Sequence, residues 1–313
     1  MNLKIFVRCF KIIVALLLVL PAVAQSSHQL KTIIIDPGHG YPDVGAHGKY
    51  SYEADVALAV ARKVVKKIQD SLPGVKVLMT RTDQNLPGGL HDANQANRWR
   101  AQFANENHGD LFVSIHCNDG GGPIHHSEVV GHHTRVYYTG KGKHRKRHTQ
   151  SVPEYNNWTT PNPAHGTETY IWAVDKNDSK QQFISDNQDT SELYGEQDSL
   201  SQGMTPEQKI MASIKMQKYF NRSKFLASLI QDQYKTQGRT AHTDLGDGVK
   251  QRTKGIWVLQ ATAMPSVLTE IGFITNPDDE EYINSQPGQD EIASAVFTAI
   301  SVYKKQIEAG RVK

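Results

Sequence analysis

Residues 32–40 read TIIIDPGHG, a short apolar run that ends in a tight turn. A run without polar alternation is typical of a strand that is buried on both faces of a sheet. Similar runs follow at Val75–Thr80, Leu111–Ile115 and Ser266–Thr269. The sequence therefore predicts several buried strands, beginning with the one that leads into the DPGHG turn.

Helical patterns lie between these runs. Apolar residues recur at helical spacing from Val56 to Ile68 and again after Pro206, and a last helix is expected over Glu291–Ile307. Strands that alternate with helices indicate an α/β fold, in which helices flank a mostly parallel central sheet. Because no internal repeat and no linker rich in proline and serine divides the body, we expect a single domain.

The composition is that of a packed globular protein, with 313 residues, of which 38% are hydrophobic and 21% charged. This balance excludes disorder of the whole chain. The formal net charge is +3, and three basic residues without any acid lie in residues 1–24, so the remainder is neutral. A neutral body gives no support for a nucleic-acid partner or an anionic membrane partner.

Residues 1–24 are expected to be a secretory signal peptide. Basic residues precede the apolar run Ile12–Leu20, and Ala22–Ala24 has the A-x-A pattern of a cleavage site. The run is shorter than the roughly 20 residues of a membrane-spanning helix. We expect residues 25–313 to be exported as a monomer that acts in a periplasm, with the medium as the alternative. Of the cysteines, only Cys117 follows the leader, and we interpret it as a small buried side chain.

Two segments fit the α/β plan poorly and are expected to be surface insertions, at about residues 119–166 and 175–207. The first is rich in glycine, histidine and basic side chains, and the second is polar and acid-leaning. A solvated loop is the simplest interpretation of the basic cluster, and a docking patch for an anionic cell-wall polymer is the alternative. The paired histidines of the first segment could bind a second metal, although such pairs in a glycine-rich loop are more often exposed.

Three polar side chains are expected to meet at one edge of the sheet. His39 lies in the turn after the first strand, and His116 directly follows the strand Leu111–Ile115. Open α/β sheets bind ligands at the carboxyl ends of their strands, so the two imidazoles are expected to converge there. Glu53 begins the next helix and can fold back beside His39. Two imidazoles and one carboxylate predict a catalytic zinc site with an open fourth position.

Glu270 is the candidate general base. It follows the buried run Pro265–Thr269, where burial of a carboxylate is costly unless it has a partner or a function. Zinc lowers the pKa of water from ~16 to about 7, and a carboxylate bonded to that water would complete its activation. Each of these residues alone would be an ordinary structural residue, and their common place at one edge of the sheet favours a site.

At these residues the chain resembles the zinc-dependent N-acetylmuramoyl-L-alanine amidases, which trim cell-wall peptidoglycan during cell separation. The resemblance implies that His39, Glu53 and His116 bind Zn²⁺ and that Glu270 is the catalytic glutamate. It also implies hydrolysis of the amide between the lactyl group of N-acetylmuramic acid and the L-alanine of the stem peptide. The matching stretches run in order along the chain: Ile33–Gly40 (IIIDPGHG), Glu53–Leu58 (EADVAL), Ala104-Asn105, Asp110–Asn118 (DLFVSIHCN), Gly166–Trp172 (GTETYIW), Gly248–Gln251 (GVKQ) and Pro265–Pro277 (PSVLTEIGFITNP).

The chain departs from the family pattern at Tyr41, where glycine is usual, and in the length of the segment 119–166. In some relatives an inserted helix occludes the zinc until a partner removes it. The segment 175–207 is a candidate counterpart of that helix, and a protein activator is therefore a candidate partner beside peptidoglycan. Two other activities stay open: a zinc peptidase that cuts within the stem peptide, and a wall-binding module without turnover. The complete set of ligands and base argues against the module.

Overall fold

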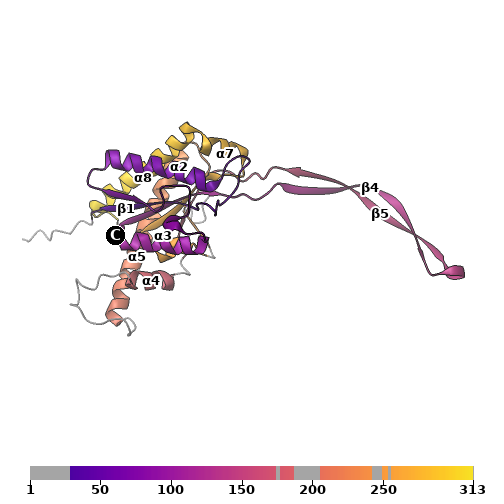
Figure 1. The fold of residues 1–313 in the computed structure, drawn as a ribbon, viewed down its shortest axis with the longest axis horizontal. Helices are drawn as coiled ribbons and strands as arrows, with labels where there is room; N and C mark the ends of the chain where they lie inside the picture. The colour runs from indigo at the N-terminus through magenta and orange to yellow at the C-terminus, as the bar shows by residue number, and fades with distance from the viewer. Residues whose placement is uncertain (1–28, 174–176, 187–204, 242–248, 253–254, 313) are drawn as a thin grey trace, which may run out of the picture.

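The computed structural model describes residues 29–173, 177–186, 205–241, 249–252 and 255–312 (Figure 1). The predicted signal peptide, residues 1–24, lies outside the described residues, as do residues 175–176 and 187–204 of the acid-leaning segment.

A six-stranded sheet with the order β2-β1-β3-β8-β6-β7 forms the centre of the molecule. The pairs β1–β2, β1–β3, β3–β8 and β6–β7 are parallel, and β6–β8 is the one antiparallel pair of this sheet among the described residues. The prediction of an α/β fold with a mostly parallel sheet is confirmed. The strands are β1 (Thr32–Pro37), β2 (Lys76–Met79), β3 (Leu111–Asn118), β6 (Glu168–Ile171), β7 (Val249–Gln251) and β8 (Ser266–Phe273).

Helices cover both faces of this sheet. Ile33 and Ile35 of β1 face a core that includes apolar residues of α2, α5 and α8, whereas Ile34 faces a smaller core with residues of α3 and α6. This alternation explains why the strands are apolar without interruption, because both of their faces are buried. The helices are α2 (Glu53–Ser71), α3 (Ala93–Glu106), α4 (Asn177–Asp186), α5 (Pro206–Thr236), α6 (Trp257–Ala261), α7 (Pro277–Asn284) and α8 (Gln286–Glu308).

Most of the segment 119–166 is a long antiparallel hairpin of β4 (Ile124–Thr139) and β5 (Lys146–Thr160). These strands form a sheet of their own, and Figure 1 shows the hairpin extending far from the body. Among the described residues, no helix is both long enough and apolar enough to cross a membrane.

Candidate metal centre

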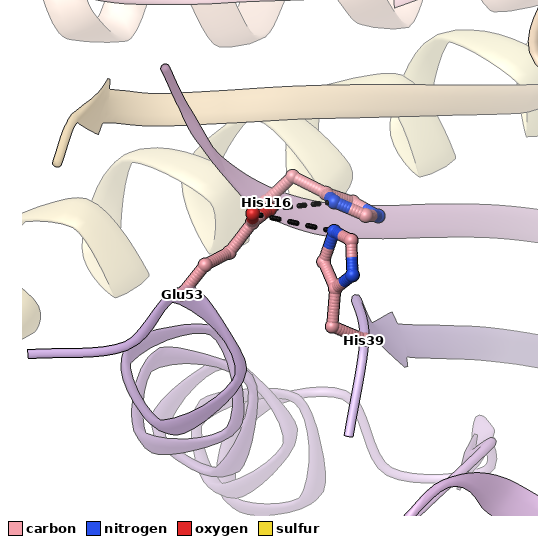
Figure 2. Close-up of side chains that lie close together, drawn as sticks. All are labelled: His39, Glu53 and His116. Atoms are coloured by element: carbon pink, nitrogen blue, oxygen red, sulfur yellow. Dashed lines mark hydrogen bonds and ion pairs between the residues drawn. The ribbon is translucent and has the colours of Figure 1, made fainter. Parts of the chain in front are cut away.

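His39, Glu53 and His116 lie together at the carboxyl edge of the sheet (Figure 2). One ligand atom of each residue lies within 4.8 Å of the others. His39 comes from the turn after β1, Glu53 is the first residue of α2, and His116 belongs to β3. The structure therefore brings together the three residues that the sequence placed at this edge.

The Glu53 carboxylate lies between the two imidazoles. Its Oε1 is 2.8 Å from Nδ1 of His116 and its Oε2 is 3.2 Å from Nε2 of His39. The backbone N–H groups of Ala46 and Cys117 also donate to it. Burial alone would raise the pKa of Glu53, but the hydrogen bonds and charges of the two histidines hold it well below its usual value. Glu53 is therefore an anionic ligand candidate with a fixed orientation.

His39 is oriented by a second carboxylate. Its Nδ1 is 2.9 Å from Oδ2 of Asp43, which leaves Nε2 directed at Glu53. Burial would lower the pKa of His39, but its contacts with Asp43 and Glu53 raise this pKa to about 10. A carboxylate on the far nitrogen of a metal-binding histidine is a recurrent arrangement, because it fixes the ring and its tautomer. The sequence analysis did not identify Asp43.

Close approach at the centre requires glycine in the turn. A Cβ atom at Gly38 would overlap the imidazole of His116, and one at Gly45 would overlap both Glu53 and His39. His39 itself adopts a positive φ of 55°, a conformation that is uncommon for residues other than glycine.

Two buried arginines hold the turn that follows β1 through hydrogen bonds to its backbone. Arg100 of α3 pairs with Asp36 and donates to the backbone oxygens of Pro37 and His39. Arg81 donates to the backbone oxygen of Gly38 at 2.6 Å and to that of Ala54 in α2 at 2.7 Å. Together the two guanidinium groups connect the β1 turn to α3 and α2. Neither arginine was predicted from the sequence.

Glu270 lies beside the three candidate ligands. It is the register partner of His116 across the β3–β8 pair, and its side chain is buried. Its Oε2 is buried without a hydrogen-bond partner among the described residues. Burial, together with the charge of Glu53, raises the pKa of Glu270 to about 8. A buried carboxylate with a free oxygen is positioned to hold a proton.

The four residues line one hollow of about 600 Å³. Asn118, Asp119 and Arg252 contribute polar walls. Residues of α6, among them Trp257, and of β8 contribute apolar walls. Behind Glu270, its antiparallel partner Glu168 is bonded to Asn118, Tyr170 and Lys250. Helix α4, which falls in the segment 175–207, packs against α5 and α6 and contributes no residue to the described lining.

The donor set fits a zinc ion, which is bound in proteins by imidazole nitrogens, carboxylate oxygens and thiolates. Cys117 does not join this set, because its side chain is buried in the core and burial raises the pKa of the thiol. Among the residues that the structure describes, no second group of three potential ligands occurs. The paired histidines lie along the hairpin, where His126 contacts Thr160 and His133 contacts Glu154.

Comparisons with known proteins agree with this arrangement. The model of the family described as N-acetylmuramoyl-L-alanine amidase matches residues 33–302. The chain belongs to this family. N-acetylmuramoyl-L-alanine amidase AmiA of Escherichia coli is 25% identical, over 90% of this chain and 78% of AmiA. The chain is thus a hydrolase of the amidase class, with peptidoglycan as its substrate.

Other relatives support the family assignment or the fold. An uncharacterized cell wall amidase of Bacillus anthracis is 28% identical over 91% of this chain, which spans 38% of that relative's length. The crystal structure of the N-acetylmuramyl-L-alanine amidase Ami1 of Mycobacterium smegmatis covers 88% of this chain and 97% of its own, with a TM-score of 0.52 at 18% identity. The amidase therefore shares its fold with a catalytic enzyme of the family.

Proposed function

We propose that this amidase is zinc-dependent, with His39, Glu53 and His116 as the ligands and Glu270 as the catalytic base. The observation that carries the proposal is the convergence of two imidazoles and one carboxylate within 4.8 Å, with the unpartnered oxygen of Glu270 in the same hollow. A hollow of this kind, with convergent polar groups and a raised carboxyl pKa, is typical of an active site.

Zn²⁺ bound there would polarise the scissile carbonyl and favour ionisation of the attacking water. Glu270 accepts the proton of that water and delivers it to the leaving nitrogen of L-alanine. Because Glu270 is buried, it keeps this proton close to the reacting atoms instead of exchanging it with bulk water. His39 presents Nε2 because Asp43 holds its other nitrogen.

A zinc peptidase that cuts within the stem peptide would use the same metal chemistry and would differ only in the shape of its groove. Mass spectrometry of digested peptidoglycan distinguishes the two. Free stem peptides that begin with L-alanine, together with unsubstituted glycan, support the amidase, whereas peptides cut internally support the zinc peptidase. Absence of any released product supports a binding module. Metal analysis of the same preparation tests whether one zinc ion accompanies each active chain.

The proposal includes export to the periplasm, with the medium as the alternative, because the substrate lies outside the cytoplasm. Fractionation of cells that make the full chain tests this location. A requirement for a protein activator is tested by assaying the purified amidase alone. Equal activity of the full chain and of a chain that lacks the segment 175–207 would remove the hypothesis that this segment occludes the zinc.

A further inference from the structure

The β4–β5 hairpin lacks a hydrophobic core of its own. Its strands are 16 and 15 residues long, which at ~3.3 Å per residue corresponds to about 50 Å. The two strands pair with one another from the root to the tip and extend away from the body (Figure 1). An isolated two-stranded hairpin is at best marginally stable in water. A hairpin of this length therefore adds little to the stability of the fold, which favours a binding role instead.

The root of the hairpin is fixed to the catalytic edge. The backbone N–H of Gly120 donates to Oγ1 of Thr275 at 2.9 Å, Asn162 donates to the backbone oxygen of Gly120, and the N–H of Gly166 donates to Asp279 at 2.7 Å. The hairpin leaves the body just after β3, which carries His116, and returns just before β6. A ligand bound near the root of the hairpin therefore lies close to the catalytic edge of the sheet.

Aromatic side chains are exposed along the hairpin. Tyr155 is 56% exposed, Tyr138 50% and Trp158 42%. Flat pairs stand across the two strands: Trp158 stacks on His126 with 5.2 Å between ring centroids, and Tyr137 stacks on His148 with 5.1 Å. Exposed aromatic faces of this kind mark interaction sites. Their flat surfaces match the apolar faces of sugar rings.

The tip of the hairpin is strongly basic. Residues 124–160 contain six lysines and arginines but only two acidic residues, so their net charge is +4. Five of the six basic residues fall within 141–147, and all of these five are exposed. Arg145 also covers the ring of Tyr138, with 4.1 Å between Cζ and the ring centroid. A positive tip on a neutral body is complementary to an anionic partner.

We propose that the hairpin is a second binding site for peptidoglycan, remote from the catalytic hollow. Its aromatic faces would stack on the sugar rings of a glycan strand, and its basic tip would pair with the carboxylates of stem peptides. The proposal rests on the proposed function for the identity of the polymer. The hairpin would keep the amidase bound to the insoluble wall between cleavage events.

Two other occupants account for less of what is observed. A second copy of the chain would bring two tips of the same charge together if the hairpins met side by side, and like charges repel. An anionic lipid surface would engage the basic tip alone, whereas exposed aromatic residues are found from Tyr138 near the tip to Trp158 near the root. Peptidoglycan combines sugar rings and carboxylates in one extended polymer.

The test uses two sets of hairpin variants and a matched control. The tip variant replaces four exposed basic residues by glutamine: Lys143→Gln, Arg145→Gln, Lys146→Gln and Arg147→Gln. The aromatic variant combines Tyr155→Ser with Trp158→Ser. The control removes four lysines on the body: Lys31→Gln, Lys66→Gln, Lys67→Gln and Lys76→Gln. Each set is built in the full chain with and without Glu270→Ala, so that binding can be measured without digestion.

Binding is measured by sedimentation with purified insoluble peptidoglycan at low and high salt. We expect the tip variant to bind about tenfold more weakly at low salt and to differ little from the parent at high salt, because salt screens exposed charges. The aromatic variant should bind more weakly at both salt concentrations. The control should bind like the parent. In the background with intact Glu270, all variants should cleave a small soluble muropeptide at the parent rate.

Unchanged sedimentation of both hairpin variants would overturn the proposal. So would an equal loss of soluble muropeptide cleavage, since the defect would then lie in the catalytic hollow. Binding of the parent to phosphatidylglycerol vesicles or duplex DNA as tightly as to peptidoglycan would indicate a general polyanion site, and hairpin-dependent self-association in ultracentrifugation would indicate a second copy. Failure of the parent to cleave soluble muropeptide would instead contradict the proposed function, and the sedimentation result would still stand.

Discussion

His116 and Glu270 are direct register partners on the adjacent parallel strands β3 and β8. Paired residues of neighbouring strands lie about 5 Å apart, so the sheet itself sets the distance between a proposed metal ligand and the proposed base. Neither side chain depends on a flexible loop for this placement. The two roles can therefore be separated by substitution.

Removal of the base should abolish turnover without loss of metal. Glu270→Gln keeps the size of the side chain but cannot accept a proton, and general-base catalysis contributes roughly 10²- to 10⁴-fold. We expect product release from peptidoglycan to fall by about this factor while zinc content stays at the parent level. A Glu270→Gln protein that loses its metal would show that Glu270 is a ligand instead of the base.

Removal of a metal ligand should abolish both zinc binding and activity. His39→Ala deletes one of three donors, so zinc content and activity should be lost together.

Asp43→Asn keeps the ligand but replaces the carboxylate that orients it, and such changes typically cost 10- to 100-fold in metal affinity or activity. Competition with a chelator measures this affinity. Retention of the parent affinity in Asp43→Asn would show that the 2.9 Å contact with His39 does not orient the ring.

Metal binding should release protons. Without a metal, the pKa of His39 is about 10 and that of Glu270 is about 8, so both groups are mostly protonated at pH 7. A cation needs the neutral imidazole and stabilises the ionised carboxylate. We therefore expect the release of between one and two protons at pH 7, and a metal affinity that rises as the pH rises from 6 to 8.

Titration calorimetry in buffers with different ionisation enthalpies measures this release. Glu270→Gln is the matched control, because it removes one titrating group and leaves the three ligands in place. The variant should release fewer protons than the parent at the same pH. Equal proton release by the two proteins would indicate that Glu270 does not titrate with the metal.

Much of the sheet and of the centre could be predicted, because the signals are local. Unbroken apolar runs marked β1, β3 and β8. His116 and Glu270 directly follow two of these runs, and His39 lies in the turn after the third. The parallel order of an α/β sheet then places these ends at one edge. Glu53 could be predicted for the same reason, since it lies at the start of a clear helical pattern.

What could not be predicted depends on tertiary contacts. Arg100 reaches the turn only because α3 packs beside it, and this contact joins residues too far apart in the sequence for a local pattern to show it. The β4–β5 hairpin escaped detection because both of its faces are exposed, so its residues do not alternate between apolar and polar. The sequence showed only that this segment fits the α/β plan poorly.

The Arg100–Asp36 pair offers a test of how the turn is held. Both residues are about 1% exposed, so Arg100→Met would leave a buried carboxylate hydrogen-bonded to hydroxyl groups alone, those of Thr80 and Ser114. Breaking a buried pair from one side typically costs about 3–5 kcal/mol. We expect a loss of this size in the free energy of urea unfolding at pH 7, and weaker metal binding.

The pH dependence of this loss follows from Asp36. Burial opposes ionisation of Asp36, but the charge of Arg100 and the hydroxyl hydrogen bonds hold its pKa below 3.8 in the folded chain. Its contribution to stability is therefore present above about pH 4 and is lost as the pH falls through the folded pKa. Without Arg100 that pKa should rise, so the difference between Arg100→Met and the parent should shrink in acid. Asp36→Asn should likewise reduce the cost of Arg100→Met, and an unchanged cost in the Asp36→Asn background would contradict direct coupling of the pair.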